Sequence, residues 1–228
     1  MKKRLLIYCE GQTEEMVVSR LLRPHLANHG VTVERPILVA SSSANPDGQR
    51  GGFVNWDAIE ADLRTLFSGD ADPNLRFTTL LDVFRMPAKV LSLAGFTSPI
   101  SSVADIEKLE AAISNVFSET RFTPYLQRHE FEALLLADPD ALASVFHRHK
   151  PGIATLKHDI VGFANTEDIN HGPDTHPAAR LAKAIAGYND LKASNAYFVL
   201  AETGFDCIRA KNPRFHAWLD HWEKWGLA

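Results

Sequence analysis

The 228-residue chain has few cysteines and no long apolar run. Cys9 and Cys207 are its only cysteines and lie far apart, so a disulfide framework is excluded and we expect a reducing, cytoplasmic location. Cys9 lies in an apolar segment and is expected to be inert packing. That segment, residues 5–9, ends at Glu10 and is too short for a signal peptide or a membrane span, so no association with a membrane is expected.

An excess of positive charge is also missing. Lys and Arg total 24 against 28 Asp and Glu, which gives a formal net charge of −4. This excludes the strongly basic class of nucleic-acid-binding proteins, although a local basic groove stays open. Hydrophobic residues make up 45% and charged residues 23% of the chain, values typical of soluble globular proteins that exclude disorder, collagen and coiled coil.

Apolar patterning predicts strands that alternate with amphipathic helices. The strands are expected at residues 5–9, 31–40, 76–81 and 122–126. This order predicts an α/β fold with a mostly parallel sheet of about four strands flanked by helices. Pro36 favours an edge position for the second strand. Residues 150–175 are expected to form a polar loop before further helices, so we divide the chain into an α/β core, 1–149, and a helical C-terminal extension packed on it, 150–228.

Acidic residues stand where the predicted strands end. Glu10 follows the first strand, Asp82 the third, and Glu130 and Glu132 the fourth. Ligands of open parallel sheets bind beyond the carboxyl ends of the strands. Carboxylates gathered there repel one another unless a cation lies among them, and oxygen ligands suit Mg²⁺ or Mn²⁺. Such ions can activate water and stabilise a leaving oxygen in phosphoryl chemistry.

Each of these acids also has a structural interpretation, as a helix cap or a surface charge. Glu10 is favoured as functional because Gly11, which follows it, lets the backbone approach a ligand. Glu14 lies in the first turn of a helix that Thr13 is expected to cap, where an acid complements the helix dipole. Glu130 and Glu132 share a face only if their segment is extended, because in a helix they diverge by about 200°.

Other chemistries find less support. His25 and His29 have the i, i+4 spacing with which a helix can hold zinc, but the segment lacks the glutamate of the zincin motif and no third ligand is evident. The chain has no Walker-type phosphate loop and no Gly-x-Gly-x-x-Gly motif. Residues 41–43 are all serine, but no pattern of His and Asp partners accompanies them, so a serine nucleophile is unsupported.

An ordered series of motifs carries a resemblance. The series is Glu10-Gly11-Gln12-Thr13-Glu14, Arg50-Gly51-Gly52, Asp82, Tyr125-Leu126-Gln127-Arg128-His129-Glu130-Phe131-Glu132-Ala133-Leu134-Leu135, Thr166-Glu167-Asp168-Ile169-Asn170, Arg180-Leu181, Gly187-Tyr188, and Gly204, Ile208-Arg209, Pro213, Phe215 and Trp218. Through most of its length the chain resembles the family called domain of unknown function 4276, a Toprim-like group of bacterial and archaeal proteins. The stretch that contains Arg128 and Glu130 is the most specific part of this resemblance.

The resemblance implies a Toprim fold, as in topoisomerases, primases and nucleases of the overcoming-lysogenization-defect type. The Toprim pattern of a glutamate after the first strand and Asp-x-Asp after the third carries over to Glu10 and Asp82. Phe84 stands where the second aspartate belongs, so we expect Glu130 or Glu132 to supply the missing carboxylate. Some members accompany ATPases in anti-phage systems, so the resemblance also implies phage defence and an ATPase partner.

The resemblance also implies positions for phosphate binding. Gly51 and Gly52 match the glycine pair of the family, and Gly11 accompanies Glu10. In the family a serine and a lysine precede the arginine that matches Arg180, and this chain has Ala178 and Ala179 there. A lysine also commonly follows the Gly-Tyr pair of the family, where this chain has Asn189-Asp190. The remaining candidates for holding a phosphodiester are cationic side chains: Arg128, Arg180, Arg209 and Lys211.

Three interpretations follow. The first is a Mg²⁺- or Mn²⁺-dependent nuclease, or a related phosphoryl-transfer enzyme acting on nucleic acid. Its assignments are Glu10, Asp82 and Glu130 as metal ligands, Glu132 or Glu14 as a further ligand or base, and Arg128 as the group that steadies the developing charge. The alternative is a non-catalytic Toprim-like module that binds nucleic acid or a partner protein, which Phe84 and the acidic net charge favour. In the third, the acids are caps and surface charges of an ordinary soluble domain.

Overall fold

The computed structural model describes residues 2–39, 55–169 and 172–228. The chain divides into two compact units: unit 1 is Met1–Leu126 with Trp222–Ala228, and unit 2 is Gln127–His221. The division therefore falls before residue 149, where the sequence suggested a boundary. The end of the chain returns to the unit that contains the first strand.

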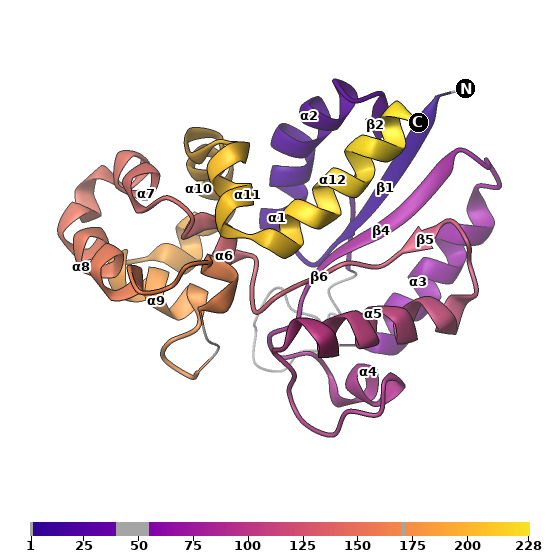
Figure 1. The fold of residues 1–228 in the computed structure, drawn as a ribbon, viewed down its shortest axis with the longest axis horizontal. Helices are drawn as coiled ribbons and strands as arrows, with labels where there is room; N and C mark the ends of the chain where they lie inside the picture. Colours follow the sequence, from indigo (N-terminus) through magenta and orange to yellow (C-terminus); the bar gives the residue numbers. More distant parts are fainter. Residues whose placement is uncertain (1, 40–54, 170–171) are drawn as a thin grey trace. The chain divides into compact units, whose positions relative to one another are not determined.

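Unit 1 is built on a parallel sheet (Figure 1). Its strands are β1 (Lys3–Cys9), β2 (Val31–Val33), β3 (Ile37–Leu38), β4 (Leu75–Asp82), β5 (Phe122–Thr123) and β6 (Leu126–Gln127), the last of which spans the boundary between the units. The order is β2-β1-β4-β5, and β3 continues beside β1 after β2. The predicted parallel sheet and the edge position of the segment with Pro36 are confirmed. Because β1 and β4 are inner strands, most of their apolar residues are buried, and Leu6 of β1 is half-buried.

Helices cover both faces of this sheet (Figure 1). On one side lie α3 (Trp56–Gly69), α4 (Ala88–Leu93) and α5 (Val103–Phe117). On the other side lie α1 (Gln12–Val17), the π-helical turn η1 (Val18–Leu22), α2 (Arg23–Ala27) and the end of α12 (Pro213–Leu227). The α/β fold with flanking helices is thereby confirmed.

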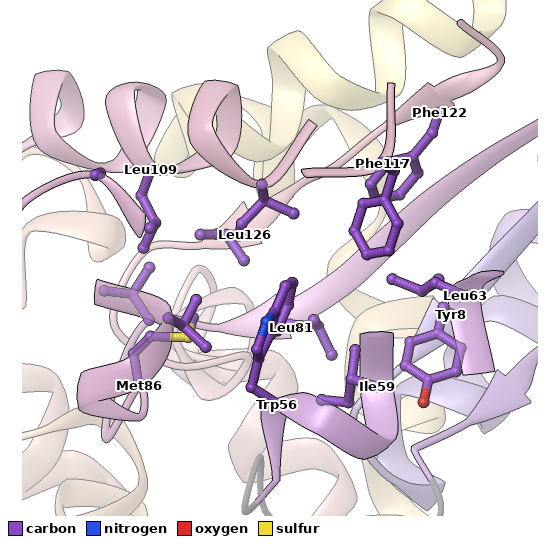
Figure 2. Close-up of a cluster of buried hydrophobic side chains, with 14 of the residues drawn as sticks. Tyr8, Trp56, Ile59, Leu63, Leu81, Met86, Leu109, Phe117, Phe122 and Leu126 are labelled. Atoms are coloured by element: carbon purple, nitrogen blue, oxygen red, sulfur yellow. The ribbon is translucent and has the colours of Figure 1, made fainter. Parts of the chain in front are cut away.

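A core cluster of unit 1 lies between β4 and the helices α3, α4 and α5 (Figure 2). The helices contribute Trp56 and Ile59 from α3 and Leu109 from α5. The rings of Phe117 and Phe122 meet edge to face with centroids 5.4 Å apart. Such pairs add about 0.5–1.5 kcal/mol to area burial, so this cluster fixes the sheet against its helices.

Unit 2 is helical among its described residues. Its elements are α6 (Glu132–Leu135), α7 (Pro139–Val145), η2 (His147–His149), α8 (Lys150–Ile160), η3 (Thr166–Asp168), α9 (Pro177–Ala184), α10 (Tyr188–Thr203), α11 (Phe205–Lys211) and the start of α12. The expectation of a polar loop over residues 150–175 is wrong for α8. Its buried residues Ile153, Leu156 and Ile160 recur at helical spacing, and Pro151 occupies the first turn, where proline is tolerated.

Candidate functional site

Glu10 and Asp82 lie together at the carboxyl edge of the sheet in unit 1. The parallel register of β1 and β4 pairs Cys9 with Leu80, which places the two acids at the ends of neighbouring strands. The backbone N–H of Asp82 donates to Oε2 of Glu10 at 2.8 Å, and the N–H of Glu10 donates to the carbonyl of Leu80 at 3.2 Å. Winding of the chain thus brings two acids, distant in sequence, to one place.

The turn after β1 is organised around a second glutamate. Gly11 caps α1 with extended backbone, and a Cβ built there would lie 3.2 Å from Oε2 of Glu14. The missing side chain therefore leaves room for Glu14, which is buried. The prediction that Thr13 caps this helix is wrong, because Thr13 lies inside α1 and no side chain makes the cap.

The electrostatic character of this edge is acidic. Burial raises the pKa of the Cys9 thiol well above its usual value, and the charges of Glu14 and Glu15 raise it further. Cys9 is fully buried, so the prediction that it is inert packing agrees with its surroundings. The negative charge of these carboxylates attracts cations and disfavours the charged thiolate form of Cys9.

The segment after β4 carries an aromatic ring and a cation in place of a second aspartate. Arg85 has a left-handed backbone, with φ 59°, which is unusual for a residue with a side chain. Its guanidinium carbon lies 5.1 Å from the ring centroid of Phe84, and Arg85 is exposed. Arg85, which lies three residues after Asp82, thus stacks its guanidinium on the ring of Phe84.

Glu130 is the centre of a polar cluster within unit 2. Its Oε2 accepts the N–H of Ala178 at 2.9 Å and lies 2.8 Å from Nδ1 of His176. His176 caps α9, and its Nδ1 also lies 3.3 Å from the N–H of Ala179. Only 7% of Glu130 is exposed, and the neighbouring His129 has φ 60° and is buried.

Glu132 is the second acid of this cluster, at the start of α6. Its Oε1 accepts from Nζ of Lys192 at 3.1 Å. Burial raises the pKa of Glu130, and the charge of Glu132 raises it further, whereas the Ala178 N–H and His176 lower it. Both glutamates are thus buried, Glu130 beside the imidazole of His176 and Glu132 beside the ammonium of Lys192. Sequence reasoning missed His176 and Lys192, because nothing in their local spacing links them to the acids.

Arg128 forms an ion pair with Asp168 inside unit 2. The adjacent Glu167 is 1% exposed and accepts the backbone N–H groups of Arg214 at 2.9 Å and Phe215 at 3.0 Å, so it caps the start of α12. Burial raises the pKa of Glu167. These contacts give the family-like segment around residues 166–168 a structural role.

The other cationic candidates for phosphate binding lie on separate helices of unit 2. Arg180 donates from Nε to the carbonyl of Thr175 at 2.7 Å, and with Lys183 it lines a cavity of about 360 Å³ that also contains Asp159 and Asp174. In α11, the guanidinium of Arg209 lies 5.9 Å from the ring of Phe205, and Nζ of Lys211 donates to the carbonyl of Ala164 at 3.3 Å. Gly51 and Gly52 lie outside the described residues.

A model of the family described as domain of unknown function (DUF4276) matches residues 9–223. The chain belongs to the DUF4276 family. The match covers most of both units, so the two-part organisation falls within the DUF4276 region. No curated protein and no solved structure matches the chain. Among the described residues, no helix is both long and apolar enough to cross a membrane.

Two glycines of the DUF4276-like series have a conformational reason. Gly187 and Gly204 both have φ 75°, at the N-terminal ends of α10 and α11, where a side chain would strain the backbone. The acids of the series fall into two groups within the DUF4276 region: Glu10 and Asp82 in unit 1, and Glu130 and Glu132 in unit 2. Each group has its own set of partners.

Proposed function

We propose that this DUF4276 protein is a Mg²⁺- or Mn²⁺-dependent phosphodiesterase that cleaves nucleic acid, with a Toprim-like metal site at Glu10 and Asp82. The observation that carries the proposal is the placement of these two acids at the carboxyl ends of neighbouring parallel strands, joined through the Asp82 N–H. Open parallel sheets bind ligands at this edge, and paired carboxylates are typical ligands of Mg²⁺.

The chemistry at this edge follows from the groups present. Glu10 and Asp82 would each offer one carboxylate oxygen, and an ion held there would polarise a phosphoryl oxygen and lower the pKa of a bound water. Glu14, buried in the first turn of α1, supplies a further acid close to Gly11 for a proton or an outer ligand. Mg²⁺ usually keeps several waters, so two or three protein oxygens suffice.

The cluster of Glu130 and Glu132 enters the proposal in a different role. Nζ of Lys192 donates to Glu132, and the His176 ring and the Ala178 N–H lie against Oε2 of Glu130, so these partners already occupy oxygens that a metal ion would need. We therefore assign the ion to Glu10 and Asp82 alone, and regard Glu130 and His176 as a buried polar pair within unit 2. The cationic side chains of unit 2, Arg180 among them, are the proposed contacts of the nucleic-acid backbone.

The test compares near-isosteric variants of the full chain on labelled DNA and RNA with Mg²⁺, Mn²⁺ or a chelator. Glu10→Gln and Asp82→Asn should each lower cleavage by at least about 100-fold, because each removes a metal ligand. Glu107→Gln, which changes an exposed glutamate of α5, is the matched control and should cleave as the parent chain does. Cleavage that survives in both site variants, or that needs no metal, contradicts the proposal.

A non-catalytic binding module is the second candidate, and Phe84 with Arg85 favours it. Where a Toprim enzyme carries a carboxylate, this chain has an aromatic ring under an exposed guanidinium, a combination that suits stacking on a base and contact with a phosphate. In that case Phe84→Ala and Arg85→Ala should weaken binding of single-stranded nucleic acid without metal, and Glu10→Gln should not. An ATPase partner and phage defence rest on the resemblance alone, and co-purification with a neighbouring ATPase would test them.

A further inference from the structure

A cluster of two histidines and a glutamate lies in unit 1, on the opposite side of the sheet from α3 and α5. His25 is on α2, His29 follows the end of that helix, and Glu223 comes from the end of α12. One ligand atom of each residue lies within 4.8 Å of the others. Glu223 is buried, and both histidines are half-buried. Glu223 is the third ligand that the sequence did not reveal, because it lies 198 residues after His25.

The backbone holds this cluster together tightly. A Cβ built on Gly226 would lie 2.0 Å from the carbonyl oxygen of His29, so only glycine lets the end of α12 approach this closely. Gly30 has φ 81° and turns the chain at the same contact. Nζ of Lys3 donates to the carbonyl of Trp225 at 2.5 Å. Because Glu223 precedes Gly226 by one helical turn, the contact places its carboxylate on the face that meets α2.

The hydrogen bonds of the histidines orient them as metal ligands. Nδ1 of His29 lies 3.0 Å from the carbonyl oxygen of His25, and since a carbonyl only accepts, Nδ1 carries the proton. The lone pair of His29 is therefore on Nε2. A ring N–H bonded to a backbone carbonyl is the usual support of a metal-binding histidine. Nε2 of His25 is hydrogen-bonded to Oε1 of Glu223, so the proton between them is the one that a metal ion would displace.

We propose that His25, His29 and Glu223 bind one Zn²⁺ ion, with water as the fourth ligand. Two imidazoles and one carboxylate form a ligand set that borderline divalent ions such as Zn²⁺ prefer, whereas Mg²⁺ prefers oxygen alone. For a tetrahedral ion with bonds of roughly 2.0–2.1 Å, ligand atoms lie about 3.3 Å apart. The ligand atoms of the cluster lie within 4.8 Å of one another, so the side chains would shift to this spacing when the ion binds. The ion takes the place of the proton shared by His25 and Glu223, which is released to solvent.

The bound ion would fasten the end of the chain to its beginning. The ligand that joins α12 to α2 closes a loop of almost the whole chain, and binding to the folded state alone stabilises that state by mass action. This site is independent of the proposed Mg²⁺ site at Glu10, since it uses nitrogen ligands on other elements. The chain can bind Zn²⁺ at this site whether or not it cleaves nucleic acid.

The experiment uses the full chain, stripped with a chelator and dialysed, and measures Zn²⁺ by elemental analysis and by competition with a chromophoric chelator. The parent chain should bind one Zn²⁺ and melt at a higher temperature with it. His29→Ala and Glu223→Gln should each weaken Zn²⁺ binding by more than about 100-fold. Loss of a residue that only hydrogen-bonds to a metal ligand already lowers metal affinity by about 10- to 100-fold, and loss of the ligand itself should lower it further. His158→Ala changes a histidine whose side chain is 89% exposed and should bind as the parent does.

Each outcome of this experiment either supports or overturns the proposed Zn²⁺ site. A parent chain without stoichiometric Zn²⁺, or His29→Ala and Glu223→Gln variants that bind as tightly as the parent, would overturn the proposal. Should a variant fail to fold, Co²⁺ bound to the parent chain decides instead: four-coordinate d–d bands without a thiolate charge-transfer band support the site, and their absence or a thiolate band from Cys9 or Cys207 refutes it. Glu10→Gln should keep full Zn²⁺ affinity, so this proposal and the proposed nuclease fail separately.

Discussion

Glu10→Gln separates the charge of the Glu10 carboxylate from its shape. Oε2 of Glu10 accepts the Asp82 N–H at 2.8 Å, and glutamine keeps an oxygen acceptor at the same reach. A hydrogen bond to a charged group contributes about 1.5–3 kcal/mol and a neutral one about 0.5–1.5 kcal/mol, so the substitution should cost about 1 kcal/mol without metal. For a chain of this length that lowers the melting temperature by about 2–4 °C.

The same substitution should remove the response to Mg²⁺. At ten times its dissociation constant, an ion that binds only the folded parent chain adds about 1.4 kcal/mol to the free energy of unfolding. Glu10→Gln should gain none of this, because an amide is a poor ligand for Mg²⁺ compared with a carboxylate. Glu10→Ala should cost about 1–3 kcal/mol even without metal, because it also takes the acceptor from the Asp82 N–H.

Urea unfolding of the parent chain, Glu10→Gln and Glu10→Ala, each with a chelator and with Mg²⁺, measures both effects. Exposed Glu107→Gln again serves as the control and should follow the parent in every condition. If Glu10→Gln gains as much stability from Mg²⁺ as the parent does, the ion does not bind at Glu10. If Glu10→Ala is as stable as Glu10→Gln, the hydrogen bond to Asp82 contributes nothing.

Three further predictions address other parts of the chain. Burial and Glu132 raise the pKa of Glu130, so its contribution to stability is present below the unfolded pKa and is lost as pH rises through the folded one. The stability of Glu130→Gln relative to the parent should therefore increase as pH rises above the unfolded pKa in urea unfolding, and a difference that is constant with pH would refute this. Gly226→Ala should destabilise the chain by about 1–3 kcal/mol in the same assay, since its Cβ would overlap the His29 carbonyl. Arg121→Met should cost about 1–3 kcal/mol, because the carbonyls of Phe67 and Asp70 lose a cationic donor; an unchanged melting temperature would refute the account.

The sequence predicted the sheet and its acidic edge because both follow from local signals. The apolar run at residues 5–9 of β1 is continuous, as expected of a strand covered on both faces, and β4 is mainly apolar apart from Arg76 and its threonines. Glu10 follows the first of these strands, and Asp82 ends the second. The parallel order then requires Glu10 and Asp82 to share an edge. The helix α8 was missed because its apolar residues are sparse and its first residues, Lys150 to Gly152, resemble a loop.

What could not be predicted depends on contacts between distant parts of the chain. Glu223 joins His25 and His29 only because α12 ends against α2, and its packing there depends on Gly226, a residue with no local signature. His176 reaches Glu130 for a similar reason, since the two lie on segments separated by a run of helices. Local periodicity fixes which face of a helix is buried, but it does not say which helix will lie against that face.

The two groups of acids call for different explanations, and their partners show why. In unit 1 the Glu10 carboxylate accepts a backbone N–H, which adds no net positive charge, and the charges of the nearby Glu14 and Glu15 raise the pKa of Cys9. In unit 2, Glu132 meets Lys192 and Glu130 meets His176, so each carboxylate is already opposed by a nitrogen base. The Lys192 side chain is 38% exposed, so solvent screens its ion pair with the buried Glu132 in part, and loss of the charge on Glu132 should cost about 1–3 kcal/mol whether or not this acid touches a metal. Glu132→Gln should accordingly destabilise the chain and spare Mg²⁺ binding, and loss of Mg²⁺ affinity without loss of stability would return Glu132 to the metal site.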